Sequence, residues 1–379
     1  MDTLRTGEKK TGKEPSRHRF HAICPYFAMF PEDFVSKWIK RVARKNDTIC
    51  DPFCGRGTTP FQALMMGREA IACDKNPVAY CITRAKTNAP SVSAVRRRLT
   101  TLERDFNTAQ WQNACRELPE FFHVAYHRGT LLQLLHLRSC LKWRSSRTDA
   151  MIGALVLGAL HGESEKSPSY LSNQMPRTIS TKPAYSVRFW KQHGYHAPER
   201  DAFALLRKQL AYRYASPPPK GAATVFCSDM RDLPGLVSPM SERIRCVITS
   251  PPYLNVTSFE EDQWLRLWFL GGGANPTYGR ISRDDRHETP DGYWRFIADM
   301  WRMLSRILSA NAQVIIRIGG KDLTPDQLVS GLVGASLVSS RRVQLAHHET
   351  STIKRRQTDV FRPGAKGCKF EVDCHFRMR

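Results

Sequence analysis

The chain lacks the long apolar runs of a membrane protein and the paired cysteines of a disulfide framework or zinc site. Its longest apolar run, 151–160, is too short to span a bilayer and predicts a buried helix. No signal-peptide core follows the polar N-terminus, so we expect a cytoplasmic protein without a membrane partner. The 11 cysteines include no Cys-x-x-Cys pair, which favours reduced, buried thiols and no metal site.

Acidic residues are scarce, with 35 Asp and Glu against 58 Lys and Arg, and the net charge is +23. The excess lies in three stretches, where Lys and Arg outnumber acids by 11 to 5 (1–45), 21 to 9 (86–222) and 10 to 4 (341–379). The stretches between them, 46–85 and 223–340, have net charges of 0 and −1. A neutral body with basic arms predicts a polyanionic partner, with a basic surface that has no specific partner as the alternative.

Two separated stretches predict one parallel, nucleotide-binding sheet. The first reads strand, loop, helix and strand, the unit from which such sheets are built. The last strand alternates in polarity like a late antiparallel strand. The expected strands are 47–51, 69–74, 223–227, 245–249, 313–319 and 370–376, and the expected helices are 58–66 and 259–270.

A glycine-rich motif, residues 51–59 (DPFCGRGTT), follows the first predicted strand. Gly55 and Gly57 would let the backbone approach a ligand closely, and the following helix would point its N-terminal amides toward it. Asp74 ends the second strand, where a carboxylate can accept both hydroxyls of a ribose. A tight turn or a helix cap could explain each feature singly. Asp229 follows the third strand, so glycines or an acid stand at the ends of three successive strands. Together these features predict a site for a nucleotide-like cofactor.

A second motif, residues 249–253 (TSPPY), follows another strand and precedes an aromatic helix. The exocyclic amine of a base is a poor nucleophile because its lone pair is delocalised into the ring. The Ser250 oxygen and the Pro251 carbonyl could accept hydrogen bonds from the amine N–H groups, and proline supplies no competing amide donor. Tyr253 could stack on the base. A plain proline-rich loop, as expected at 216–219, is the alternative.

Together the motifs resemble motifs I and IV of the S-adenosylmethionine-dependent DNA amino-methyltransferases. The resemblance covers roughly 18–85 and 223–376 and implies an α/β fold, a Rossmann-like class I methyltransferase sheet with a mainly helical insert. Segment 20–31 resembles motif X, and Arg56 stands where the family often has a small residue. The implied catalytic residues are Ser250, Pro251, Pro252 and Tyr253. The implied S-adenosylmethionine-binding residues are Tyr26, Phe27, Asp51, Pro52, Phe53, Gly55, Gly57, Thr58, Thr59, Asp74, Asn76 and Asp229.

The residue before the two prolines bears on the target. In the family, Ser at the position of Ser250 mostly accompanies cytosine N4 and Asp mostly accompanies adenine N6. The chain contains no Pro-Cys dipeptide, which disfavours carbon-5 methylation. We therefore expect methylation of cytosine N4 in a base flipped out of double-stranded DNA, by a solitary enzyme or one with a cognate restriction endonuclease. The alternatives are adenine N6, an RNA base, or a catalytically silent DNA-binding protein.

The basic insert is the natural target-reading element. We expect Asn173 and Arg177 to contact base edges, and Lys182, Arg188 and Lys191 to bind phosphates. Arg280 and Arg283, in the loop 271–290, offer a second DNA face. Three aromatic residues of the insert are expected in its core, with base stacking as the alternative: Tyr185, Phe189 and Trp190.

These expectations divide the chain into four segments. Residues 1–17 form a disordered basic tail, and 18–85 form the first part of the catalytic domain, with motif X and the cofactor loop. Residues 86–222 form the helical insert, and 223–379 form the second part of the catalytic domain, with the TSPPY motif and the C-terminal strands.

Overall fold

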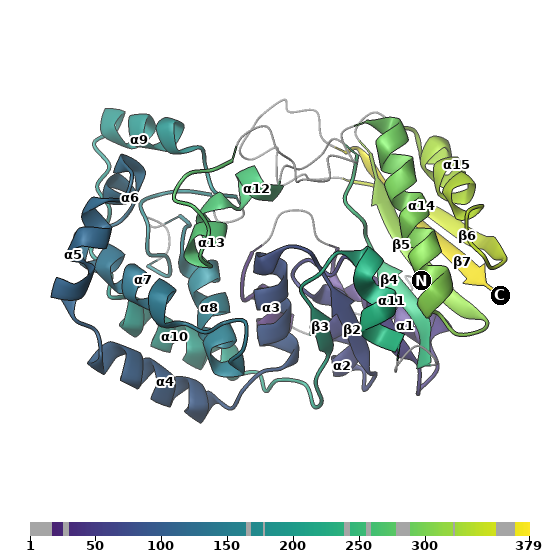
Figure 1. Cartoon of the computed structure of the whole chain (residues 1–379), viewed down its shortest axis with the longest axis horizontal. Helices are drawn as coiled ribbons and strands as arrows, with labels where there is room; N and C mark the ends of the chain where they lie inside the picture. Colours follow the sequence, from purple (N-terminus) through teal and green to yellow (C-terminus); the bar gives the residue numbers. More distant parts are fainter. Residues whose placement is uncertain are drawn as a thin grey trace, which may run out of the picture.

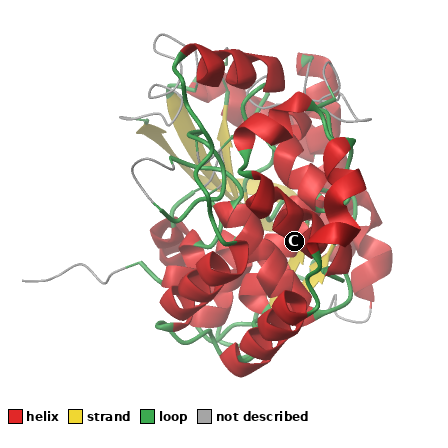
Figure 2. Cartoon of the chain, turned by 90° about the vertical axis from the view of Figure 1, so that its left-hand side faces the viewer, coloured by secondary structure: helices red, strands yellow, loops and turns green. Residues whose placement is uncertain are grey.

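A computed structural model of the chain describes residues 17–25, 30–163, 168–176, 179–238, 243–254, 259–277, 289–320, 323–353 and 368–379. A sheet with its covering helices lies on one side, and a body of helices on the other (Figure 1). Seen from the helical side, the helices stand in front of the strands (Figure 2).

The sheet has seven strands in the order β3-β2-β1-β4-β5-β7-β6. The first five are parallel, and β7 runs antiparallel to both β5 and β6. This is the strand order of the class I methyltransferases, so the predicted Rossmann-like fold is confirmed. The strands are β1 (Thr48–Asp51), β2 (Ala70–Cys73), β3 (Thr224–Phe226), β4 (Ile244–Thr249), β5 (Ala312–Gly319), β6 (Val343–Thr352) and β7 (Phe370–Met378). Only β6 has no counterpart among the predicted strands.

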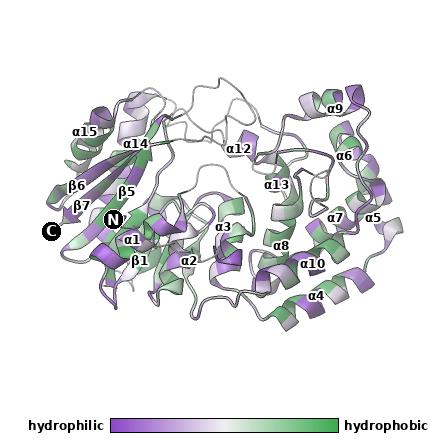
Figure 3. Ribbon diagram, turned by 180° about the vertical axis from the view of Figure 1, so that it is seen from behind, coloured by the Kyte–Doolittle hydropathy of each residue, from purple (hydrophilic) through white to green (hydrophobic). Residues whose placement is uncertain are grey.

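Both faces of the central strands are buried, because helices cover each side of the sheet (Figures 1 and 3). Alternate residues therefore enter different cores: Ile49 packs on the side of α1 and α2, whereas Cys50 packs on the opposite side. This explains why the strands are apolar throughout rather than alternating. The helices are α1 (Glu32–Val42) and α2 (Thr58–Met65) on one face, and α11 (Leu233–Val237), α14 (Pro290–Ile307) and α15 (Pro325–Ser336) on the other.

The predicted insert is mainly helical, and α8 lies at its centre. Every residue of α8 from Asp149 onward is buried, as the apolar run 151–160 predicts. None of the described helices combines the length and the apolar character needed to cross a bilayer. Helix α3 (Pro77–Thr87) runs across the predicted start of the insert at residue 86. The helices within the insert are α4 (Val92–Arg104), α5 (Thr108–Arg116), α6 (Glu120–Ala125), α7 (Arg128–Cys140), α8 (Arg147–Ala159), α9 (Pro183–Gln192) and α10 (Ala202–Tyr214).

The core of this helical body draws on residues from outside the insert. Phe20, from the short 3₁₀ helix η1 (Arg19–Ala22), and Phe61 of α2 belong to it. So do the aromatic residues after the TSPPY motif, Trp264 and Trp268. The helix expected at 259–270 is broken at Gln263 into α12 (Phe259–Asp262) and α13 (Trp264–Phe269). The segment that follows the second motif is therefore built into the helical body.

One close backbone contact joins α8 to the segment after η1. A Cβ atom at Gly158 would lie 2.1 Å from the carbonyl oxygen of Ile23. That distance is far below van der Waals contact, and neither backbone can move alone. Glycine is thus required at this position by packing and not by backbone conformation.

We predict that Gly158→Ala lowers the free energy of unfolding by about 1–3 kcal/mol, the usual cost of overpacking a core. Urea unfolding followed by circular dichroism measures the change. Gly334→Ala is the matched control, because Gly334 lies in α15 with no atom within 4 Å of an added Cβ. That substitution should leave stability unchanged or raise it by up to about 1 kcal/mol. A Gly158→Ala protein as stable as the wild type would refute the contact.

Candidate functional site

The predicted site residues gather at the carboxyl edge of the parallel strands. Asp51 ends β1, Asp74 follows β2, Asp229 follows β3 and Ser250 follows β4. Strands β1 and β4 are neighbours, and the strand order reverses between them. Such a switch point opens a crevice in which α/β sheets bind their ligands. The two motifs, about 190 residues apart in sequence, therefore meet at one place.

A short hydrogen bond links the motifs directly. The Thr249 hydroxyl donates to Asp51 Oδ1 over 2.6 Å, and the Phe53 amide donates to the same oxygen over 3.2 Å. The other oxygen, Oδ2, is buried and has no partner among the described residues. Burial raises the pKa of Asp51 to about 7. A second link runs from the buried Thr59 hydroxyl to the Ile248 carbonyl, over 3.1 Å.

Both glycines of the glycine-rich loop adopt left-handed conformations, with φ of 48° at Gly55 and 74° at Gly57. A Cβ at Gly57 would lie 2.6 Å from the Thr83 hydroxyl oxygen, so this glycine packs against α3. A Cβ at Gly55 would meet nothing within 4 Å, which leaves open space beside the loop. Thr58 and Thr59 begin α2 directly after the loop, so the first amides of α2 lie at the carboxyl edge of the sheet.

Asp74 holds the loop from the second strand. Its Oδ2 accepts the Gly55 amide over 2.8 Å, and its Oδ1 accepts the Asn76 amide over 3.0 Å. Burial raises the pKa of Asp74 to about 6, while these two hydrogen bonds oppose the shift. Each carboxylate oxygen keeps a further lone pair, so the group can still accept from a ribose. The loop, the space at Gly55 and this acid fit the nucleoside and methionine parts of S-adenosylmethionine.

The remaining predicted cofactor residues have protein partners or serve as packing. Asn76 caps α3 by accepting the Val78 amide over 2.8 Å. The Arg231 guanidinium pairs with both Asp229 oxygens at 2.8 Å and lowers the pKa of that carboxyl. Pro52 is buried, and Phe53 packs against Phe296 with 5.5 Å between ring centroids. Tyr26 and Phe27 lie outside the described residues.

In the TSPPY loop, Ser250 and Tyr253 are half-buried, Pro251 is buried and Pro252 is exposed. The Tyr253 hydroxyl donates to Glu371 Oε1 over 3.0 Å, and the Ser250 hydroxyl lies 3.5 Å from the Tyr253 oxygen. The Tyr253 ring lies on Gly319 of β5, where an added Cβ would come within 2.7 Å of it. Strands β5 and β7 thus position the tyrosine from the side opposite to β1.

Glu371 belongs to an ionic cluster that the motif analysis did not find. Arg317 of β5 forms a two-pronged pair with Asp373, at 2.6 and 2.8 Å, and lies 3.3 Å from a Glu371 oxygen. The same guanidinium sits 4.0 Å from the centre of the Phe34 ring. A sequence signal did exist, because two acids occupy alternate positions of the predicted strand 370–376. Their partner, however, is set by the antiparallel register of Arg317 with Asp373.

The predicted DNA contacts divide into three groups. Asn173 is 3% exposed, and its amide nitrogen donates to the Tyr195 carbonyl over 3.2 Å while its oxygen accepts the Gln174 amide over 3.0 Å. It therefore braces the insert and is not presented to a base, contrary to the prediction. Arg177, Arg280 and Arg283 lie outside the described residues. The cations predicted to bind phosphates are exposed: Lys182, Arg188 and Lys191.

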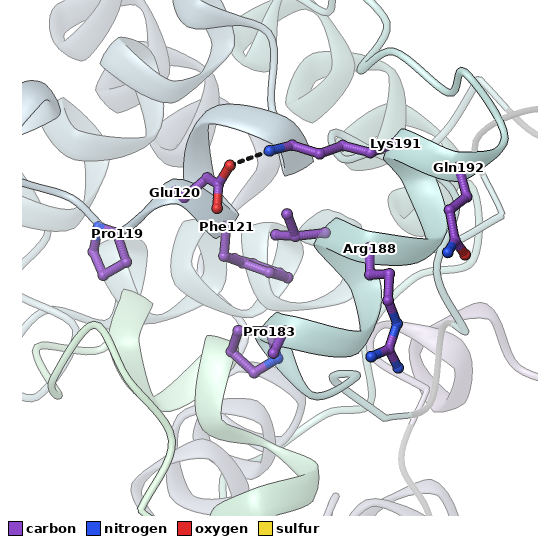
Figure 4. Close-up of a pocket in the computed structure, with 9 residues that line it drawn as sticks. Pro119, Glu120, Phe121, Pro183, Arg188, Lys191 and Gln192 are labelled. Carbon is purple, nitrogen blue, oxygen red and sulfur yellow. Dashed lines mark hydrogen bonds and ion pairs between the residues drawn. The ribbon is translucent and has the colours of Figure 1, made fainter.

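These three cations lie on and beside α9, which borders a hollow of about 540 Å³ against α6. Phe121, Val187 and Arg188 line the hollow, and Lys191 pairs with Glu120 beside it (Figure 4). Trp190 is buried, as predicted for a core residue. The other two aromatic residues predicted for the core differ in burial. Phe189 is half-buried, whereas Tyr185 is 53% exposed, so the prediction that Tyr185 lies in the core was wrong.

We predict that Tyr253 and Glu371 are energetically coupled. Their hydrogen bond joins a phenol to a carboxylate, so a double-mutant cycle of Tyr253→Phe and Glu371→Gln should give a coupling of about 1–3 kcal/mol. Urea unfolding of the four proteins measures it. Ser351→Ala combined with Tyr253→Phe is the control pair, because the Ser351 hydroxyl contacts only the Glu371 carbonyl, at 3.5 Å. Additive effects of Tyr253→Phe and Glu371→Gln would contradict the pairing.

Comparisons with known proteins bear on the cofactor half of the site. Residues 2–84 match the model of a family described as DNA methylase. A 74-residue stretch is 38% identical to the Type II methyltransferase M.MjaII of Methanocaldococcus jannaschii, covering 20% of this chain and 14% of that protein. The family match includes the glycine-rich loop, α2 and Asp74. The geometry and this match agree on an S-adenosylmethionine site.

Solved structures give only distant likenesses. The rRNA methyltransferase aviRa from Streptomyces viridochromogenes is 14% identical, with 93% of this chain and 87% of that chain covered and a TM-score of 0.33. TrmN from Thermus thermophilus is 9% identical, with 97% and 55% covered and a TM-score of 0.38.

Proposed function

We propose that the protein is an S-adenosylmethionine-dependent methyltransferase that methylates an exocyclic amine of a DNA base. One observation supports this most directly: the 2.6 Å hydrogen bond from Thr249 to Asp51 sets the Ser-Pro-Pro-Tyr loop beside the cofactor loop. A methyl donor and an amine acceptor bound by these loops would lie next to each other. Catalysis by such a site is mainly positioning, since no strong general base is needed before attack.

S-Adenosylmethionine supplies the methyl group, and the chain supplies its placement. Asp74 accepts from the ribose while its own bonds to the Gly55 and Asn76 amides keep the carboxylate in place. The open space at Gly55 admits the part of the cofactor next to the sulfonium. The amine then faces the Ser250 oxygen and the Pro251 carbonyl, which accept hydrogen bonds from its two N–H groups and free its lone pair for attack.

Ser250 can act as an acceptor only if its own proton points elsewhere. Two successive hydrogen bonds direct this proton away from the amine. The Ser250 hydroxyl lies 3.5 Å from the Tyr253 oxygen, and the Tyr253 hydroxyl donates to the Glu371 carboxylate at 3.0 Å. Because a carboxylate only accepts, the Tyr253 proton is committed to it, and the Tyr253 oxygen is left as an acceptor for Ser250. The lone pairs of Ser250 then remain available to the amine.

The proposed substrate is double-stranded DNA, with cytosine N4 as the acceptor. The DNA methylase family match at 2–84 supports DNA, and Ser250 before the two prolines supports cytosine. Such a base must leave the duplex to reach the switch point. Adenine N6 is the first alternative, and the amine of an RNA base is the second. A cognate restriction endonuclease is a candidate partner of the proposed enzyme.

We predict that Ser250→Ala retains S-adenosylmethionine binding and loses most methyl transfer, because it removes a positioning interaction of the acceptor. Calorimetry measures the binding, and mass spectrometry of nucleosides from incubated DNA measures the product. Ser228→Ala serves as the control for a serine at the edge of the site, since the Ser228 hydroxyl donates to Asp232 at 2.7 Å and to neither motif.

The methylated nucleoside found by mass spectrometry identifies the atom that accepts the methyl group. N4-methylcytosine in DNA is the expected nucleoside, and it separates chromatographically from the carbon-5 isomer. N6-methyladenine would overturn the choice of base and leave the mechanism in place. Methylated RNA with unmodified DNA would overturn the proposed substrate.

We also predict that α9 carries DNA affinity. Replacing Lys182, Arg188 and Lys191 by alanine should weaken DNA binding and flatten its salt dependence, because fewer counterions are released. Fluorescence anisotropy between about 50 and 200 mM salt measures the slope. Replacing three exposed cations of the sheet side, Arg243, Arg302 and Arg306, is the charge-matched control. If the salt dependence of DNA binding is unchanged in the α9 variant, the DNA binds to another part of the protein.

A further inference from the structure

The glycine-rich loop contains a buried cation whose side chain lacks adequate partners. Arg56, between Gly55 and Gly57, is 4% exposed. Its Nε and Nη2 atoms are buried and make no hydrogen bond to any described residue. Burial lowers the pKa of Arg56 to about 10, so the guanidinium is charged at neutral pH. Burying an unpaired charge is costly, and a native protein retains it where a counter-ion completes the site.

Among the described residues, no acid pairs with Arg56. Lys86 is fully buried, and its Nζ donates to the Arg56 carbonyl over 2.6 Å. Burial lowers the pKa of His21 to about 2, so this neighbour is neutral, and its Nδ1 has no partner among the described residues. Glu32, an acid near Arg56 among the described residues, pairs with Arg17 at 2.9 Å. The cluster is therefore complementary to an anion that it does not itself contain.

We propose that Arg56 binds the carboxylate of the methionine part of S-adenosylmethionine. This inference rests on the proposed function, and it explains why an arginine stands where the resembled family often has a small residue. A guanidinium matches a carboxylate in shape and can donate two parallel hydrogen bonds, and both unpartnered atoms, Nε and Nη2, lie on one edge of the group. The adjacent glycines let the same ligand approach the backbone.

Lys86 acts on this site as a positioning residue. Its ammonium bonds the carbonyl of Arg56 at 2.6 Å and lies 3.5 Å from that of Gly57. It thereby fixes the backbone from which the arginine side chain starts. Burial and the nearby charge of Arg56 lower the pKa of Lys86 well below its usual range, so the contribution of Lys86 is its hydrogen bonds and the partner for a carboxylate is Arg56 itself.

The test compares two ligands that differ by one group: S-adenosylmethionine and decarboxylated S-adenosylmethionine, which lacks only the carboxylate. Calorimetric titration of the full chain gives the affinity for each. Arg56→Met should weaken S-adenosylmethionine by about 10- to 100-fold, the usual effect of losing hydrogen bonds to a charged group. The same variant should change the affinity for decarboxylated S-adenosylmethionine by less than about twofold. Arg56→Lys keeps the positive charge but loses the paired donors of the guanidinium, so its affinity for S-adenosylmethionine should lie between those of the wild type and Arg56→Met.

Two controls make the outcome specific. Arg96→Met removes an exposed charge from α4 and should change neither affinity, and Asp74→Ala should weaken both ligands alike through their common ribose. Equal losses for both ligands in Arg56→Met and Arg56→Lys, or no loss for either, would overturn the inference. A wild-type protein that binds neither ligand would instead overturn the proposed function, which separates the two failures.

Discussion

The hydrogen bond between Thr249 and Asp51 is the interaction on which the site depends. It spans 2.6 Å and closes a loop of nearly two hundred residues at the point where the strand order reverses. Both groups are buried, so water cannot take the place of either partner. Burying this carboxylate has a cost, visible in an unpartnered Oδ2 and in a pKa raised to about 7.

Each half of the site is braced from outside its own motif. The cofactor loop is held by Asp74 from β2 and by Lys86 from α3. The acceptor loop is held by Glu371, which Arg317 keeps in place from β5. Support of this kind, in which the residues that bind ligands are fixed by others behind them, is what a positioning mechanism requires. The late antiparallel strand β7 thus serves the site as well as completing the sheet.

The sequence predicts those parts of the molecule whose chemistry is local. Gly55, Asp74 and Ser250 each follow a short apolar strand, so their place at the carboxyl edge follows from the parallel sheet. The pairing of Tyr253 with Glu371 is not predictable in this way, because it depends on the register of strands far apart in the chain. Asn173 shows another limit: a polar residue in an aperiodic segment can brace the fold as well as face a ligand. Helix α9 was not predicted, although Pro183 in its first turn is a helix-start signal that the sequence carries.

The shared core of the helical body limits how such an enzyme could evolve new specificity. Phe20, Phe61 and Trp268 come from three separate stretches, yet all pack among the helices of the insert. The backbone of Ile23 also lies against Gly158, with no room for a side chain between them. An insert held in this way cannot be exchanged as a cassette, because removing it would expose apolar surface on the catalytic domain. For the DNA-binding role proposed for α9, changes of target are therefore expected through substitutions on its exposed face, and not through replacement of the whole insert.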